Sequence, residues 1–252
     1  MEHREVMLDD KYDLVEGKAY MTGIQALVRL PLDQQRLDSQ AGHNTAGFIS
    51  GYRGSPLGGY DQQLRAAQKW LDAHHIKFWE GLNEDLGATA VWGSQQLGLF
   101  PGADREGLFG FWYGKAPGAD RTGDVFKHAN AAGSSALGGV LAVLGDDHMC
   151  KSSTLPSQSE FAMQDAEIPV LNPASIQDVL DYGLHGIAMS RFTGGWSAMT
   201  ALADTMDSGA VVDVSLDRMN FVTPEFERPD GGLHIRRADP PLEKERRLRE
   251  FK

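Results

Sequence analysis

A glycine-rich segment, Gly51–Tyr60, lies between a predicted strand over Ala46–Ser50 and a predicted helix over Asp61–His74. Small residues in such a turn let backbone N–H groups approach an anion, and the start of the next helix favours negative charge. Arg53 adds a forked donor for a carboxylate or phosphate, and Ser55 adds a hydroxyl. The segment has neither the Gly-Lys-Ser/Thr of a P-loop nor the spacing Gly-x-Gly-x-x-Gly. It predicts an anion-binding loop, with an ordinary Gly/Pro turn as the alternative.

A second candidate is the acidic start of the helix that the sequence predicts over Asn83–Leu99. Asn83 is suited to cap this helix, which leaves Glu84 and Asp85 in its first turn. Acidic residues at a helix start stabilise it through the helix dipole, and this structural role is one interpretation. The other is a carboxylate that the fold holds beside a ligand, where it exchanges protons with a ring nitrogen.

A third candidate is the polar stretch Gly145–Ser159, which follows a predicted buried strand over Gly139–Leu144. The clustered hydroxyl groups of Ser152, Ser153 and Thr154 suit a carboxylate or phosphate ligand, and a solvated loop is the alternative.

Carboxylates and imidazoles near this stretch are possible metal ligands. Their spacing matches no metal-binding signature, so the sequence predicts no resident metal ion. Cys150 is the only cysteine, which excludes an internal disulfide and an iron–sulfur cluster built from about four thiolates of this chain. The residues weighed as metal ligands were Asp146, Asp147, His148 and His128.

The composition limits the classes of protein to which the chain can belong. Its 252 residues have a formal net charge of −11, which disfavours nonspecific binding to nucleic acid or to an anionic membrane. No apolar run approaches the roughly 20 residues that span a bilayer, and the amino-terminal residues 1–13 lack the apolar centre of a signal peptide. The sequence therefore predicts a soluble, cytoplasmic protein with no nucleic-acid or membrane partner.

The candidate residues are separated by alternating strand and helix patterns. This order predicts an α/β fold, in which a doubly wound, mostly parallel sheet has helices on both faces. Ligand-binding loops in such folds lie at the carboxyl ends of the strands, as Gly51–Tyr60, Tyr113–Asp120 and Gly145–Ser159 would. Further predicted strands lie over Lys18–Thr22, Ile76–Trp79, Gly107–Tyr113, Ile168–Leu171 and Ala210–Val214, and further helices over Gly23–Gln40, Gly118–Ala132 and Ser175–Arg191.

Three regions follow from the pattern along the chain. Residues 1–16 are predicted to be an amino-terminal extension, and residues 17–224 the folded domain. Residues 225–252 are rich in charge and poor in apolar residues, which predicts a linker or the truncated start of a further segment.

Five ordered motifs over about Gly17–Val214 together resemble a known family. They are Tyr52-Arg53-Gly54-Ser55-Pro56-Leu57; Asn83-Glu84; Lys127-His128 with Asn130 and Gly138-Gly139; Asp146-Asp147 with Ser152-Ser153 and Gln158-Ser159-Glu160; and Pro169-Val170-Leu171 with Pro173. The family is the indolepyruvate:ferredoxin oxidoreductases, within the thiamine-diphosphate-dependent 2-oxoacid:ferredoxin oxidoreductases. Arg53 stands where the family has a proline and Leu57 where it has a small hydroxyl residue, which predicts altered substrate contacts.

The resemblance implies a thiamine-diphosphate-binding fold of the pyrimidine-binding type, corresponding to the amino-terminal domain of those enzymes. Glu84 matches the catalytic glutamate that hydrogen-bonds ring nitrogen N1′ of the cofactor. The resemblance also implies that Asn83, Lys127 and His128 face the cofactor. It implies a substrate-binding role for Arg53, Ser55, Asp147, His148, Ser152 and Ser153.

The activity that the resemblance implies is the oxidative decarboxylation of arylpyruvates to acyl-CoA, with electron transfer to ferredoxin. The family binds the diphosphate and its Mg²⁺ through a Gly-Asp-Gly…Asn motif, which this sequence lacks. Mg²⁺ and the iron–sulfur clusters are therefore expected on missing segments or on a partner, which is either the rest of the enzyme or another subunit of a homo- or hetero-oligomer. The chain is expected to be incomplete, and inactive, by itself.

Two other functions remain open from the sequence. One is a non-catalytic relic of the same fold that binds a partner without needing the cofactor. The other is an unrelated α/β protein that binds a phosphate ligand through Gly51–Tyr60.

Overall fold

The computed structural model describes residues 5–237 and 239–252, so the first four residues of the predicted extension lie outside the described part. The strands are β1 (Lys18–Thr22), β2 (Thr45–Gly51), β3 (Ile76–Glu80), β4 (Gly107–Lys115), β5 (Val140–Asp146), β6 (Val170–Leu171), β7 (Ser197–Leu202) and β8 (Gly209–Asp213). The helices are α1 (Asp10–Asp13), α2 (Gly23–Gln40), α3 (Tyr60–Ala66), α4 (Gln68–Ala73), α5 (Glu84–Ser94), α6 (Ala116–Arg121), α7 (Gly123–Ala132), α8 (Glu160–Asp165), α9 (Ile176–Thr193), α10 (Ala203–Met206) and α11 (Pro241–Phe251). Single 3-10 turns lie at η1 (Leu97–Leu99) and η2 (Leu216–Arg218).

The centre of the fold is a six-stranded sheet in the order β3-β2-β4-β5-β7-β6, and every pairing in it is parallel. Strand β5 is buried along its whole length, as expected for a central strand that is covered on both faces. Strands β1 and β8 form a separate antiparallel ribbon. The predicted doubly wound, mostly parallel α/β fold is therefore confirmed.

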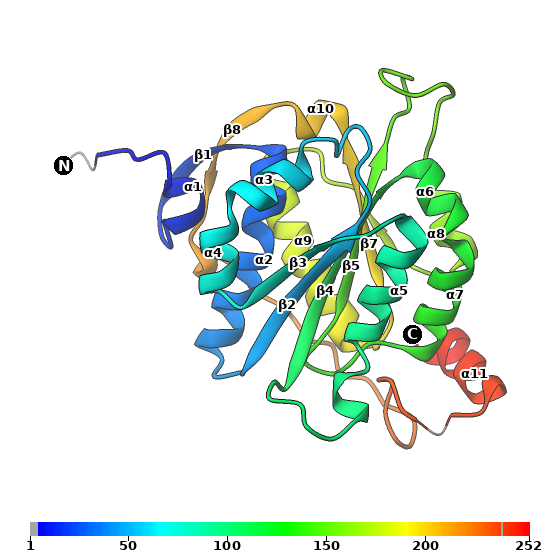
Figure 1. Ribbon diagram of the computed structural model, residues 1–252. Coiled ribbons are helices and arrows are strands. Elements are labelled where there is room, and N and C mark those ends of the chain that lie inside the picture. The colour runs from blue at the N-terminus through cyan, green and yellow to red at the C-terminus, as the bar shows by residue number, and fades with distance from the viewer. Residues whose placement is uncertain (1–4, 238) are drawn as a thin grey trace.

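Helices cover both faces of this sheet, and each face has its own apolar core (Figure 1). Helices α2, α3, α4 and α9 lie on one face, and α5, α6, α7 and α8 lie on the other. Successive residues of a strand point to opposite faces. On β4, Phe111 and Tyr113 accordingly belong to the first core, and Trp112 belongs to the second.

Helix α2 shows how local sequence determines the helices. Thr22 caps it, because its hydroxyl accepts the Gln25 N–H at 3.3 Å while the Gln25 side chain accepts the Thr22 N–H at 3.0 Å. Pro31 lies inside the helix and cannot donate to the carbonyl of Leu27 four residues earlier. The buried Tyr60 hydroxyl donates to that carbonyl at 3.3 Å, which satisfies it from outside the helix.

The charged segment 225–252, predicted as a linker or the start of a further segment, packs against the domain. Figure 1 shows α11 beside α7. The Lys252 ammonium donates to the carbonyls of Asn130 at 3.2 Å and Gly194 at 3.1 Å, and burial lowers the pKa of Lys252 to about 7. The Lys252 side chain therefore attaches the end of this segment to the domain through two backbone carbonyls.

The helices were also compared with the requirements for a membrane span. In the described part of the chain, none combines the length and apolarity needed to cross a bilayer.

Candidate functional site

The predicted site residues gather at one edge of the sheet because its strands are parallel. Strands β2, β3, β4 and β5 all run toward this edge and end at Gly51, Glu80, Lys115 and Asp146. Seven of the ten predicted site residues lie in the loops that follow β2, β3 and β5, and an eighth, Glu84, is the first residue of α5. This edge is where ligands bind in doubly wound folds.

Glu84 lies at this edge, in the first turn of α5. The side chain of Asn83 caps the helix by accepting the Leu86 N–H at 2.9 Å, so the predicted cap is confirmed. The Trp112 indole N–H donates to the backbone carbonyl of Glu84 at 3.0 Å, which fixes the start of the helix on β4. The position of Glu84 is thus set by contacts that do not use its carboxylate.

The Glu84 carboxylate reaches over Gly118 in α6. A Cβ placed on Gly118 would lie 2.4 Å from Glu84 Cγ and 2.5 Å from Oε1, so the glycine leaves the space that this side chain fills. The side chain is 14% exposed, and Arg121 Nη1 lies 3.9 Å from Oε2. Within the described residues the carboxylate accepts no hydrogen bond, so both oxygens are free to accept an N–H from a ligand.

The loop after β2 contains Arg53 and Ser55. Gly51, at the end of β2, lies against Gly87 of α5. A Cβ atom added to Gly87 would lie 2.8 Å from the Gly51 Cα atom. This close approach brings the loop and the start of α5 together at one end of the sheet. Arg53 is exposed and Ser55 is half-buried, so both lie within reach of a ligand from solvent.

Asp147 organises the loop after β5. Its carboxylate accepts the N–H groups of Lys151 at 2.8 Å and Ser152 at 2.9 Å, and the Ser153 hydroxyl at 2.6 Å. These hydrogen bonds favour the charged form and lower the pKa of Asp147 to about 2. The hydroxyl of Ser153, predicted to bind substrate, therefore donates to Asp147 in this structure. Lys115 joins the loop to β4 by donating to the Ser152 carbonyl at 3.1 Å.

An open cleft of about 790 Å³ separates this loop from α6. Its walls combine one cation, Lys115, and two carboxylates, Asp120 and Asp165, with hydroxyl groups and apolar side chains. Such a lining offers both polar groups and an apolar surface to a ligand. The residues that line it include Lys115, Pro117, Ser152, Ser153, Leu155 and Phe161.

Lys127 and His128 lie elsewhere, midway along α7. Lys127 pairs with Asp165 at 2.5 Å, and the His128 ring stacks on Trp92, which comes more than two turns after Glu84 in α5. Both side chains are exposed. The structure does not bring them together with Glu84, and their contact with a cofactor stays a prediction.

The sequence reading missed three residues at this edge. Gly118 and Glu160 are two of them, because each contacts site residues that are distant in the sequence: Gly118 lies against Glu84, and Glu160 lies near Asp146 and His148. Asp61 is the third: it is 2% exposed, and within the described residues neither of its carboxylate oxygens has a hydrogen-bond partner of normal geometry. It lies beside the Tyr113 hydroxyl and the Glu80 carboxylate. The pKa of Asp61 is raised, mainly because the carboxyl group is buried. The Glu80 carboxylate raises it further, while the neighbouring Tyr113 hydroxyl lowers it.

We expect Asp61→Asn to stabilise the protein at pH 8 and to have little effect near pH 4. A carboxyl group whose pKa is raised by folding stabilises the folded state only while it is protonated, and this contribution is lost as the pH rises through the folded-state pKa. A gain of about 1 kcal/mol would raise Tm by about 2–4 °C in a domain of this size. Thermal unfolding at both pH values measures it, with the exposed Asp72→Asn as control. A gain that does not depend on pH would contradict this account of Asp61.

The fold and the position of the candidate site define a class: a doubly wound α/β domain whose candidate ligand site lies at the carboxyl ends of its strands. No family model matches the chain, and no curated protein sequence matches it. Among solved structures, the chain is similar to 2-oxoglutarate:ferredoxin oxidoreductase from Magnetococcus marinus, which was solved with 2-oxoglutarate, coenzyme A and succinyl-CoA bound.

This similarity has a TM-score of 0.57 at 14% sequence identity. It covers 86% of this chain and 34% of the other, so the chain spans about a third of the length of that enzyme chain. At this level of identity the similarity establishes the fold alone.

Proposed function

We propose that this chain is the pyrimidine-binding domain of a thiamine-diphosphate-dependent 2-oxoacid:ferredoxin oxidoreductase that acts on arylpyruvates such as indolepyruvate. One observation supports this most. Backbone contacts hold Glu84 in place, while its carboxylate has no hydrogen-bond partner among the described residues. It occupies this position in a fold similar to that of a 2-oxoacid:ferredoxin oxidoreductase.

The surroundings of Glu84 fit the aminopyrimidine ring of the cofactor. A carboxylate that is largely buried and accepts no hydrogen bond from the described residues is suited to bind a ring nitrogen that holds a proton. Gly118 keeps the space beside it free of a side chain. Glu84 would hold the ring, while the diphosphate and Mg²⁺ would be held by other segments or a partner.

When bound, thiamine diphosphate supplies the electron sink for decarboxylation of a 2-oxoacid. The Glu84 carboxylate would accept a hydrogen bond from the ring nitrogen and hold the proton there. Lys115 and Arg53 place positive charge at the same edge, where they can attract the carboxylate of the substrate. Asp147 keeps the loop with Ser152 and Ser153 closed beside the cleft.

The cleft supports an aromatic substrate. Leu155 and Phe161 are 73% and 70% exposed, and Pro117 lies with them in the cleft lining, so an apolar surface is open to a ligand. An indole or phenyl ring packed there would remove apolar area from water, while the 2-oxoacid end would meet Lys115.

The proposal is tested with the complete protein that contains this domain, as it is isolated from cells. We expect CoA-dependent reduction of ferredoxin or a viologen dye when thiamine diphosphate, Mg²⁺ and an arylpyruvate are present. Indolepyruvate and phenylpyruvate are compared with pyruvate and 2-oxoglutarate, and we expect the highest kcat/KM for the arylpyruvates.

Each other outcome would correct a defined part of the proposal. Preference for 2-oxoglutarate or pyruvate would overturn the substrate class alone. Oxidation of none of the four acids, with no binding of thiamine diphosphate by calorimetry, would favour a non-catalytic partner-binding relic of the same fold.

A further inference from the structure

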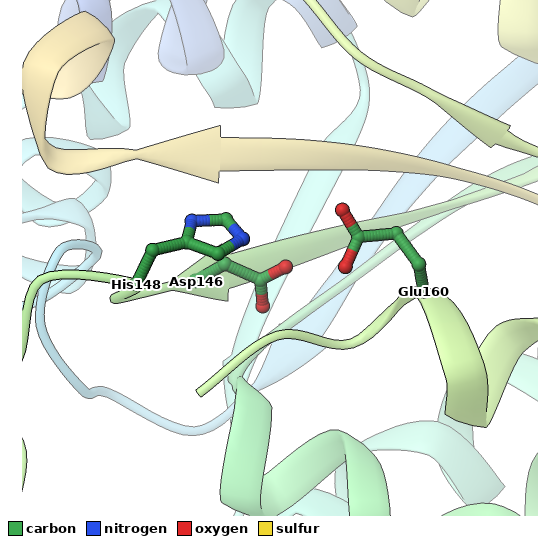
Figure 2. Close-up of side chains that lie close together, drawn as sticks. All are labelled: Asp146, His148 and Glu160. Atoms are coloured by element: carbon green, nitrogen blue, oxygen red, sulfur yellow. The ribbon is translucent and has the colours of Figure 1, made fainter. Parts of the chain in front are cut away.

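Three side chains with ligand atoms suited to a metal ion converge just beyond the end of β5. They are Asp146, the last residue of β5; His148, two residues later; and Glu160, the first residue of α8. Figure 2 shows the three side chains pointing toward one another, and one ligand atom from each lies within 4.8 Å of the others.

The backbone brings Glu160 to the other two residues. Asp147 and Ser157 form an antiparallel bridge, with N–H···O distances of 3.2 Å in both directions, so the chain returns on itself after β5. Ser159 then donates its N–H to Asp146 at 3.0 Å and its hydroxyl at 2.5 Å. These two bonds orient the Asp146 carboxylate and leave it further lone pairs.

The charges in this cluster are not balanced. Asp146 is 1% exposed, and the Oε2 atom of Glu160 is buried with no hydrogen-bond partner in the part of the chain that the structure describes. No ion pair joins His148 to either carboxylate within the same residues. Two carboxylates that face each other in this way repel, and a buried oxygen without a partner costs free energy, so the arrangement favours a bound cation.

We propose that Asp146, His148 and Glu160 bind one divalent transition-metal ion of the Zn²⁺ or Mn²⁺ type. An imidazole with two carboxylates is a ligand set for these ions, whereas Mg²⁺ and Ca²⁺ prefer oxygen ligands alone. Bonds of about 2.0–2.2 Å to one ion separate two ligand atoms by at most about 4.4 Å, so the three side chains, whose ligand atoms lie within 4.8 Å of one another, would draw together around the ion.

Such an ion would fix both ends of the loop over residues 147–159. The sequence predicted no resident metal ion, although Asp146 and His148 were among the four possible ligands there. Of the other two, Asp147 is used by the loop backbone and His128 lies on α7. The inference does not rest on the proposed function, because metal content is measured without turnover.

The test uses the intact protein after treatment with a chelator. Equilibrium dialysis against micromolar Zn²⁺ or Mn²⁺, followed by elemental analysis, compares wild type with His148→Asn, Glu160→Gln and the double variant. We expect one ion per chain to be lost in the double variant, and affinity at least about tenfold weaker in each single variant. Subtracting the metal content of the double variant from that of wild type removes the contribution of any other metal centre.

Asp124→Asn is the matched control, because Asp124 and His128 form an exposed carboxylate–imidazole pair, 3.5 Å apart, that has the same chemistry. We expect it to bind the ion as wild type does. His148 is exposed and Glu160 is half-buried, so the circular dichroism of all variants is expected to be unchanged. The proposal is overturned if wild type and the double variant bind equal amounts of metal, or if Asp124→Asn loses as much as Glu160→Gln.

Discussion

If the proposed oxidoreductase function holds, Glu84→Gln is expected to lower kcat/KM of the enzyme by about 10²–10⁴-fold, the range for loss of a proton-transferring group. The amide keeps the size and shape of the side chain but cannot take up a proton from a ring nitrogen. The contacts that position the residue, the Asn83 cap and the Trp112 bond to its backbone carbonyl, remain in the variant. Steady-state kinetics with an arylpyruvate measures the effect, and thermal unfolding checks that the fold is intact.

The stability of Glu84→Gln should differ little from that of wild type. The change removes a contact of 3.9 Å to Arg121, whose side chain is 53% exposed, and such surface pairs contribute about 0–1 kcal/mol. Asp85→Asn is the matched control: it lies in the same helix turn, and the amide oxygen can still accept the Thr122 hydroxyl, which donates at 3.0 Å. Near-normal turnover in Glu84→Gln would remove this carboxylate from the mechanism.

Gly118→Ala tests position separately from chemistry. The added methyl group would meet the Glu84 side chain within 2.4–2.6 Å, so the carboxylate must move while its charge is kept. We expect weaker cofactor binding and at least about tenfold lower kcat/KM, since small displacements of catalytic groups have effects of this order. A variant with wild-type kinetics would show that the observed placement of Glu84 is not needed.

The sequence predicts the sheet well where apolar runs are long and flanked by loops. Helix α2 has the predicted bounds, and the ends of β2, β4 and β5 differ from the predicted ends by at most two residues. Strand β7, over Ser197–Leu202, was not predicted at all. Its residues are small, polar or flexible, with little of the β-branched and aromatic content that marks a strand, although almost all are buried. Its place between β5 and β6 comes from tertiary packing, which overrides such weak local preference.

The candidate site was predictable only where neighbours in sequence act together. Asn83 and Glu84 are adjacent, so the cap and the acidic turn could be predicted from the helix pattern. Glu160 meets Asp146 only because a bridge folds the loop back, and Asp61 meets Tyr113 only through the parallel sheet. Neither pairing leaves a spacing in the sequence that a local pattern could detect.

Arg29→Met is expected to destabilise the domain by about 3–5 kcal/mol, the cost of removing one partner from a buried ion pair. Arg29 and Asp33 are both 0% exposed and pair at 2.8 Å between Nε and Oδ2. Arg29 also donates to the carbonyls of Lys11 at 3.0 Å and Leu14 at 2.7 Å, so it joins α2 to the segment around α1. At about 2–4 °C per kcal/mol, Tm should fall by roughly 6–20 °C.

The same variant has a local consequence that separates it from general loss of packing. Methionine fills most of the volume of arginine but leaves the Lys11 and Leu14 carbonyls and one Asp33 oxygen without their donor. The amides around α1 should therefore exchange with deuterium faster than in wild type, and this increase should exceed any increase at the amides of β5. Arg246→Met is the control, since Arg246 is 52% exposed on α11 and its pairs with Glu243 and Glu250 should contribute about 0.3–0.5 kcal/mol each. Equal losses of stability in the two variants would contradict the argument, because burial of the charge, rather than the number of ion pairs, is what makes Arg29 costly to remove.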